Sequence, residues 1–157
     1  SSFVGQNFGA GKAERVRKSY LLTLGYSAFI AGFFGMLFLL FGREFLSLFT
    51  SESAVIDAGL ERIRIMCFVF PLSALMDDTT AAARGVGKGL VPMIFVFLGS
   101  CVFRVIWIYT VFAYFHTISS LYLLYPFSWI ITGAAEIFYF LYCYKKIVVP
   151  LGASRKA

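Results

Sequence analysis

The sequence predicts an all-α integral membrane protein with four transmembrane helices. Of its 157 residues, 60% are hydrophobic and only 14% are charged, whereas a soluble domain carries about a quarter charged residues. The apolar residues form four long runs, and most of the charged residues lie between these runs. A chain with this distribution cannot build a water-facing surface, so we expect its partner to be a lipid bilayer.

Four segments are long enough to cross the bilayer as helices, because a ~30 Å hydrocarbon core needs about 20 apolar residues. They are residues 20–41, 65–83, 90–115 and 121–144. Pro71 lies inside the second segment and removes one backbone hydrogen bond, so we expect a kink there. Residues 43–49 predict a short, separate interfacial helix. In the first segment, Gly25, Gly32 and Gly35 either mark contacts with a neighbouring helix or are merely tolerated.

The two ends of the chain are expected outside the membrane. Residues 1–19 predict a loop that leads into the first span, and residues 145–157 predict a tail. The sequence begins at Ser1, with neither an initiator methionine nor a signal peptide. We therefore interpret the chain as a piece of a longer polypeptide.

Lysine and arginine residues are distributed unevenly between the two predicted sides. Ten belong to the opening loop, the turn at residues 84–88 and the tail, and three belong to the opposite side. Because basic residues collect in the cytoplasm, this bias predicts that the loop, the turn and the tail are cytoplasmic. The net charge of +6 does not predict a nucleic-acid partner, because the cations flank apolar runs and do not line one face with stacking aromatics.

The sequence offers no metal centre or catalytic group, and we expect neither a cofactor nor an enzymatic activity. Cys67, Cys101 and Cys143 lie in separate apolar stretches, without a CxxC pair or a His/Cys cluster. The single histidine, His116, lies in a predicted turn without a nucleophile or a second base nearby.

Charged residues inside the predicted spans are the candidate functional residues, because such residues are costly in a membrane and usually have a role or a partner. Asp77 lies roughly 9 Å and Glu136 roughly 12 Å from the predicted cytoplasmic ends of their spans, by helix rise. Arg104 lies roughly 21 Å from that side. We therefore expect Asp77 and Glu136 at a similar depth, and Arg104 bound to a carboxylate or carbonyl group of helices outside this chain.

Two interpretations of the carboxylates remain open. Two carboxylates at one depth suit proton or sodium coupling, since their protonation can be switched by access to each side in turn. Sodium could then bind transiently at Asp77. Alternatively, Asp77 or Asp78 caps local backbone, and Glu136 bonds a neighbouring helix. Asp78 is about 100° round the helix from Asp77, so both cannot face one cavity equally well.

Three motifs resemble those of the multidrug and toxic compound extrusion (MATE) family, and they occur in the family's order and spacing. They are Gly5-Gln6-Asn7-Phe8-Gly9-Ala10-Gly11-Lys12, Ala83-Arg84-Gly85-Val86-Gly87-Lys88 followed by Pro92, and Tyr125-Pro126-Phe127-Ser128-Trp129. The resemblance extends from Val4 to about Lys146. Its motif residues in predicted loops are Gly5, Gln6, Asn7, Gly9, Gly11, Arg84, Gly85 and Gly87.

The resemblance implies a twelve-helix bacterial inner-membrane antiporter of two lobes, in which this chain supplies helices nine to twelve of the second lobe. Such proteins export organic cations and related drugs in exchange for Na+ or H+ by alternating access. The first lobe and helices seven and eight would then be further parts of the same polypeptide. Asp77 is the position most similar to an acidic residue of the family's tenth helix. The alternative interpretation is a four-helix membrane scaffold or assembly protein without transport activity.

Overall fold

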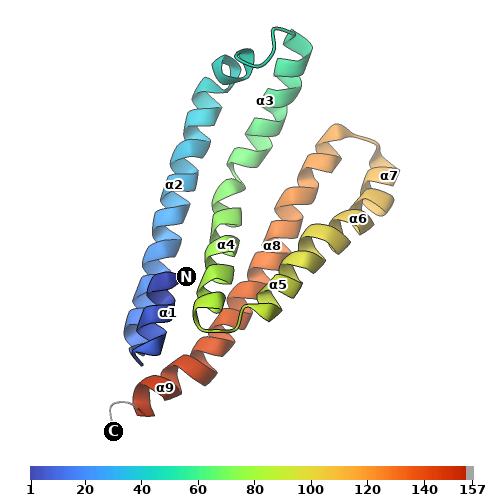
Figure 1. Ribbon diagram of the computed structural model, residues 1–157. Helices are drawn as coiled ribbons and strands as arrows, with labels where there is room; N and C mark the ends of the chain where they lie inside the picture. The colour runs from blue at the N-terminus through green and yellow to red at the C-terminus, as the bar shows by residue number, and fades with distance from the viewer. Residues whose placement is uncertain (155–157) are drawn as a thin grey trace.

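The computed structural model describes residues 1–154, except for the side chains of residues 118 and 119, and shows helices joined by short turns (Figure 1). The α-helices are α1 (Ser2–Gly9), α2 (Ala13–Ser47), α3 (Ser53–Cys67), α4 (Phe70–Gly85), α5 (Leu90–Phe97), α6 (Phe103–Trp107), α7 (Ala113–Phe115), α8 (Ile118–Cys143) and α9 (Val149–Ser154). Three π-helical stretches connect some of them: η1 (Leu98–Val102), η2 (Ile108–Phe112) and η3 (Tyr144–Val148). Over the described residues the protein is all-α, as the sequence predicts.

The helices form an elongated bundle in which the chain runs up and down (Figure 1). α2 runs in one direction, α3 and α4 return, α5 to α7 run back again, and α8 and α9 return last. α4 packs against both α2 and α8. α4 is therefore the helix through which the two halves of the bundle are joined.

α2 is longer than the first predicted span. It continues to Ser47, and only Phe41, with φ −112° and ψ 16°, departs from helical geometry. Phe41 forms a kink that separates the main part of α2 from a short helical stretch that ends at Ser47, which agrees with the separate short helix predicted at residues 43–49; its interfacial position stays a prediction. No proline interrupts this stretch, and Gly42 lets α3 approach, since a Cβ added there would lie 3.1 Å from Leu60 Cδ2. Beyond the kink, Arg43 bonds Asp57 of α3 at 2.5 Å.

The second predicted span is divided between two helices. α3 ends at Cys67 and α4 begins at Phe70, so the interruption lies just before Pro71. This position fits proline, whose missing N–H is tolerated in the first turn of a helix. Three helices of the described residues are long and apolar enough to cross a membrane: Ala13–Ser47, Leu90–Phe115 and Ser120–Ser154. The fourth span, at residues 65–83, remains a prediction.

The predicted span at residues 90–115 corresponds to one helical path with two π-helical stretches. It ends at His116, whose left-handed backbone (φ 51°) and exposed side chain agree with the predicted turn. The first π-helical stretch, η1, contacts α8. The contact is tight at Gly99, where an added Cβ would lie 1.8 Å from Thr132 Oγ1.

The segments predicted as a loop at residues 1–19 and as a tail at residues 145–157 are helical over much of their described length. The first contains α1, a turn at Gly11 with φ 69°, and the start of α2. The second continues α8 through η3 and α9 as far as Ser154. It is helical because it packs on the bundle: Tyr144 Oη donates to the Ala13 carbonyl at 3.2 Å. Arg155 and Lys156 of the predicted tail lie outside the described residues.

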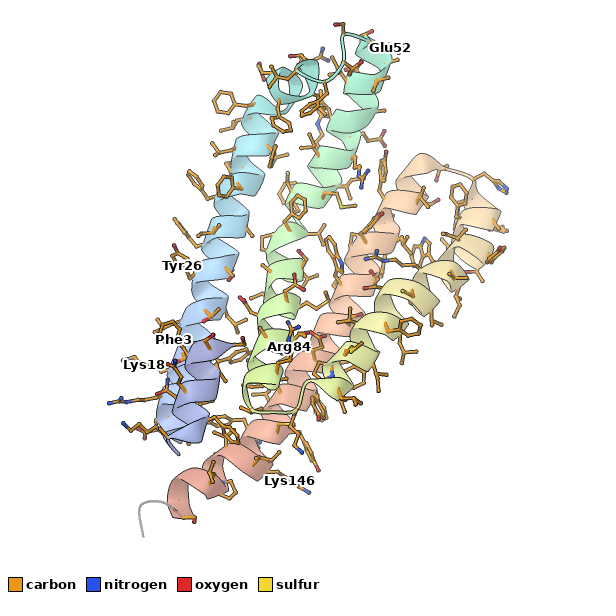
Figure 2. The ribbon with its side chains drawn as sticks, in the orientation of Figure 1. Phe3, Lys18, Tyr26, Glu52, Arg84 and Lys146 are labelled. Atoms are coloured by element: carbon orange, nitrogen blue, oxygen red, sulfur yellow. The ribbon has the colours of Figure 1, made fainter. Side chains whose placement is uncertain are left out.

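One end of the bundle gathers α1, the α4–α5 turn and α9, while the α2–α3 and α7–α8 connections lie at the other (Figure 1). The largest buried apolar cluster lies toward the first end and consists of Val4, Val16, Tyr20, Ala82, Ala83, Val86, Phe140 and Val148. Elsewhere, large apolar side chains point outward, among them Phe29 at 71% exposed and Leu40 at 66%. Figure 2 shows such side chains projecting from the outer face of α2. This arrangement suits contact with lipid.

Candidate functional site: a buried polar cluster between three helices

A cluster of polar side chains lies where α4 packs between α2 and α8. We call it the polar cluster, and its members are Tyr20 of α2, Asp78, Thr79 and Thr80 of α4, and Glu136 of α8. Tyr20, Thr79, Thr80 and Glu136 are buried, while Asp78 is half-buried. Polar groups buried in an apolar bundle are costly unless they are hydrogen-bonded. Their bonding pattern therefore indicates which of them are structural.

Glu136 is the most deeply buried acidic residue of the described chain, and it is only partly satisfied. Its side chain is fully buried. Oε1 accepts a hydrogen bond from Thr80 Oγ1 at 2.7 Å. Oε2 is buried as well, but it has no hydrogen-bond partner. A half-satisfied carboxyl group in the middle of a helix bundle is unusual and indicates a role beyond packing.

Tyr20 and Thr79 form the second link of the polar cluster, between α2 and α4. Their hydroxyl oxygens lie 2.9 Å apart. Thr79 Oγ1 donates its proton to the Leu75 carbonyl at 2.7 Å, so Tyr20 is the donor in the bond to Thr79. The ring of Tyr20 also packs on Phe140 of α8, with centroids 4.4 Å apart. This link is fully satisfied and holds α2, α4 and α8 together.

The Tyr20–Thr79 bond predicts two unequal mutational effects. Tyr20→Phe should lower the free energy of unfolding by about 1 kcal/mol, because Thr79 keeps its bond to Leu75. Thr79→Val should cost more, about 1–3 kcal/mol, because the buried Tyr20 hydroxyl then loses its acceptor. Thermal unfolding in detergent measures both. Tyr26→Phe is the matched control on the same helix, since Tyr26 is 68% exposed; an equal loss in all three variants would contradict this assignment.

The two adjacent aspartates occupy different environments. Asp77 is exposed, and its spacing places it on the face of α4 that carries Thr80 and Arg84. Asp78 is half-buried, and its Oδ2 atom is buried without a hydrogen-bond partner. An added Cβ at Gly133 of α8 would lie 3.8 Å from Met76, so Asp77 and Glu136 lie at a similar level, as helix rise predicts. Asp77 and Asp78 thus point to different sides of α4.

Arg104 has partners within this chain. Its Nε donates to Ser128 Oγ at 3.4 Å, and its Cζ lies 4.6 Å from the centroid of the Tyr125 ring. Neither partner is a carboxylate or a carbonyl group, so the prediction that Arg104 binds such a group of helices outside this chain stays a prediction. Ser128 precedes Glu136 by roughly 12 Å of helix, so Arg104 lies well away from the polar cluster. A cation over an aromatic face is a favourable pairing that sequence alone did not reveal.

The glycine motifs join α1 to the end of α4. An added Cβ at Gly5 would lie 3.2 Å from the Gly85 carbonyl oxygen, and one at Gly85 would lie 2.8 Å from the Ser1 carbonyl oxygen. Gly5, Gln6, Asn7 and Gly9 are helical, which corrects their placement in a loop; Arg84 and Gly85 are likewise the last residues of α4. Gly11 and Gly87 lie in turns with positive φ, 69° and 74°. The close approach of α1 to α4 explains why Gly5 and Gly85 have no side chain.

Asn7 adds a hydrogen bond to this junction. Its Nδ2 donates to the Phe3 carbonyl at 2.8 Å and lies 3.5 Å from Ser19 Oγ of α2. Asn7 thus ties α1 to the first turns of α2. Together with the glycines, it makes the first motif a structural element of the bundle end.

Sequence reasoning found the carboxylates of the polar cluster but not its hydroxyl groups. Thr79 and Thr80 follow Asp78 directly, and their position beside two acidic residues in a span was an available signal. Tyr20 gave no such signal, because a tyrosine at the end of a span is expected at a membrane interface. Over residues 1–154 no group of three His, Cys, Asp or Glu residues could hold a metal ion.

Comparison with known proteins agrees with the membrane fold. The MatE family model matches residues 1–110, which is most of the chain. No curated protein matches the chain. Proteins of this family are transporters, which is compatible with a chain that is not an enzyme. The chain therefore belongs to the MatE family, the multidrug and toxic compound extrusion transporters, and is a multi-pass membrane protein.

Proposed function

We propose that this chain is part of a secondary active antiporter that exports organic cations and related drugs in exchange for Na+ or H+. The observation that carries the proposal is Glu136, a buried and half-satisfied carboxyl group in an apolar bundle of a chain that belongs to a transporter family. A carboxyl group in such a place can take up a cation or a proton and release it when access changes. Asp77 and Asp78 of α4 are the further candidates for ion coupling or cargo binding.

We propose that the chain forms helices nine to twelve of the second lobe. Asp77 supports this assignment, since it is exposed on α4 although charged groups in a membrane normally face a protein interior or a water-filled cavity. An exposed carboxylate at this depth is expected to face a cavity that further helices complete. Those helices are the first lobe and helices seven and eight of the same polypeptide. The other partners are the lipid bilayer and small organic cations.

The proposed location is the bacterial inner membrane, with α1, the turn at residues 84–88 and the C-terminal tail in the cytoplasm. Basic residues support this orientation. Lys12, Arg15, Arg17, Lys18, Arg84, Lys88, Lys145 and Lys146 belong to segments that gather at one end of the bundle (Figure 1). Arg43, Arg62 and Arg64 are the cations toward the other end. Basic residues collect on the cytoplasmic side of membrane proteins.

The proposed mechanism is alternating access. The two lobes rock about a central site, and ion binding at a carboxylate favours the state that releases cargo outside. Within this chain, the interruption at residues 68–69, between the end of α3 and Pro71, is the proposed place for bending, because the regular helix is broken there. On the other side of this interruption, α4 is joined to α2 and α8 through the polar cluster.

The test is efflux of a cationic dye from cells that express the complete protein. The sodium and proton gradients are collapsed separately, with empty-vector cells as the control. We expect efflux to be lost when one of the two gradients is removed, which would also identify the coupling ion. Good membrane expression without efflux under either gradient would contradict the antiporter and favour a scaffold protein.

A further inference from the structure

In the described structure, Glu136 accepts one side-chain hydrogen bond and forms no ion pair. Thr80 Oγ1 donates to Oε1 at 2.7 Å, and the buried Oε2 atom has no partner. Phe140, fully buried one turn further along α8, packs against the ring of Tyr20. Glu136 is therefore followed along α8 by a fully buried aromatic residue, which makes its surroundings on that side apolar.

The ionisable groups around Glu136 come from two helices. α4 contributes Asp77, Asp78 and Arg84, and α2 contributes Tyr20. No described cation forms an ion pair with Glu136. On the third side, α8 packs against α5, which contains no ionisable residue. Two carboxylates and one arginine that forms no ion pair with Glu136 do not compensate a charge on a fully buried carboxyl group.

We propose that Glu136 is a proton-binding site, at which Thr80 holds Oε1 and the proton occupies Oε2. This inference rests on the proposed antiporter function and specifies the ion that this site takes. With the proton bound, Glu136 is neutral and can remain buried between α4 and α8. Without the proton, the carboxylate carries a charge for which Oε2 has no partner while α4 and α8 remain packed together.

A proton fits this site better than a sodium ion. Hard cations are held by several oxygen ligands. Here the described oxygens at Glu136 are its own carboxyl oxygens and the Thr80 hydroxyl, and Oε2 has no polar neighbour within hydrogen-bonding distance. A proton needs one oxygen atom, which Oε2 provides.

Proton release should loosen the contact between α4 and α8. A buried charge without a partner is unfavourable, so the ionised form requires water or a cation at Oε2. Water can reach this atom only when the two helices separate. Met76 and Gly133, one turn above Thr80 and Glu136, report on this separation, because an added Cβ at Gly133 would lie 3.8 Å from Met76 Cβ.

The first test is infrared difference spectroscopy of the purified complete protein between acidic and alkaline pH. The wild-type protein should show the C=O stretching band of a protonated carboxylic acid that disappears at alkaline pH, and Glu136→Gln should lose this band. Thr80→Val should keep the band but shift it to higher frequency, because the Glu136 carbonyl oxygen loses its hydrogen bond. Glu14→Gln, an exposed site, is the matched control and should leave the band unchanged. A band that persists in Glu136→Gln, or that Thr80→Val does not shift, would overturn the proposal.

The second test is oxidative cross-linking of Met76→Cys with Gly133→Cys, in a background in which Cys67, Cys101 and Cys143 are replaced. The distance of 3.8 Å between Met76 Cβ and a Cβ added at Gly133 matches the usual Cβ separation of about 3.8 Å in a disulfide. The same pair with Glu136→Gln corrects for the intrinsic pH dependence of thiol oxidation. The cross-linking yield with Glu136, divided by the yield with Glu136→Gln, should be near one at acidic pH and fall several-fold at alkaline pH. A ratio that does not change with pH would refute the link between protonation and helix packing.

Neither readout depends on transport. A Glu136 band and a pH-dependent cross-link in a protein without dye efflux would support the proton site and reject the antiporter. Efflux that persists in a protein lacking both signals would support the antiporter and reject the site.

Discussion

Gly99→Ala is expected to destabilise the protein by about 1–3 kcal/mol, the usual cost of overpacking a tight contact. A Cβ at Gly99 would lie 1.8 Å from Thr132 Oγ1 and 3.1 Å from Thr132 Cβ. Thr132 is buried, so α8 or the π-helical stretch η1 would have to move. The measurement is the free energy of unfolding in detergent, from thermal or denaturant titration.

A double-mutant cycle tests whether the clash with Thr132 is the cause. Thr132→Ala removes the hydroxyl oxygen that an alanine at residue 99 would meet first, so Gly99→Ala should cost less in that background, by about 1 kcal/mol or more. Gly25→Ala is the matched control, because nothing lies within 4 Å of a Cβ added there. It should be neutral or slightly stabilising, since alanine is the better helix former. Additive effects of Gly99→Ala and Thr132→Ala would contradict the predicted contact.

The glycines show what the sequence could and could not predict. Among the three glycines of the first span, Gly35 lies against a neighbouring helix, with an added Cβ 3.1 Å from the Cys67 carbonyl oxygen. Gly25 and Gly32 have open space around them. Small residues are a local feature, whereas a close contact depends on the register between two helices. For the same reason, Gly99 could not be singled out from the sequence alone.

The helices themselves were more predictable than their ends. Long charge-free runs predict membrane helices because every backbone group must be satisfied within the segment. The same apolar stretches do not indicate where packing extends a helix. The contact of Gly42 with Leu60 and the bond from Tyr144 to Ala13 are long-range interactions, and they stabilise helix beyond the ends of the predicted spans.

The candidate site was predictable in its carboxylates but not in its bonding. Asp77 and Glu136 were identified because a charge in an apolar run is conspicuous. The bond between Thr80 and Glu136 joins residues on different helices, and its existence depends on how α4 is rotated against α8. The contact of Arg104 with Ser128 was not predicted for the same reason, because it also depends on the register of two helices.

Asp77→Asn is expected to reduce ion-driven efflux by the complete protein to the empty-vector background, while membrane expression stays unchanged. Asparagine has nearly the same shape as aspartate, but it can neither release a proton nor offer a full negative charge to sodium. Asp77 is exposed on α4, so this substitution leaves no buried group without a partner, and folding should be preserved. The measurement is cationic-dye efflux at matched membrane expression.

Two further variants make this result interpretable. Asp57→Asn is the matched control, because Asp57 is an exposed aspartate that pairs with Arg43 near the opposite end of the bundle; exposed pairs contribute little, so efflux should persist. Asp78→Asn distinguishes the role of Asp78 in efflux from that of Asp77. If Asp77 faces the transport cavity, Asp78→Asn should retain more efflux than Asp77→Asn. Unchanged efflux in Asp77→Asn would remove Asp77 from the mechanism. Loss of efflux in Asp78→Asn instead would assign ion coupling to the half-buried face of α4, where Asp78 Oδ2 has no partner.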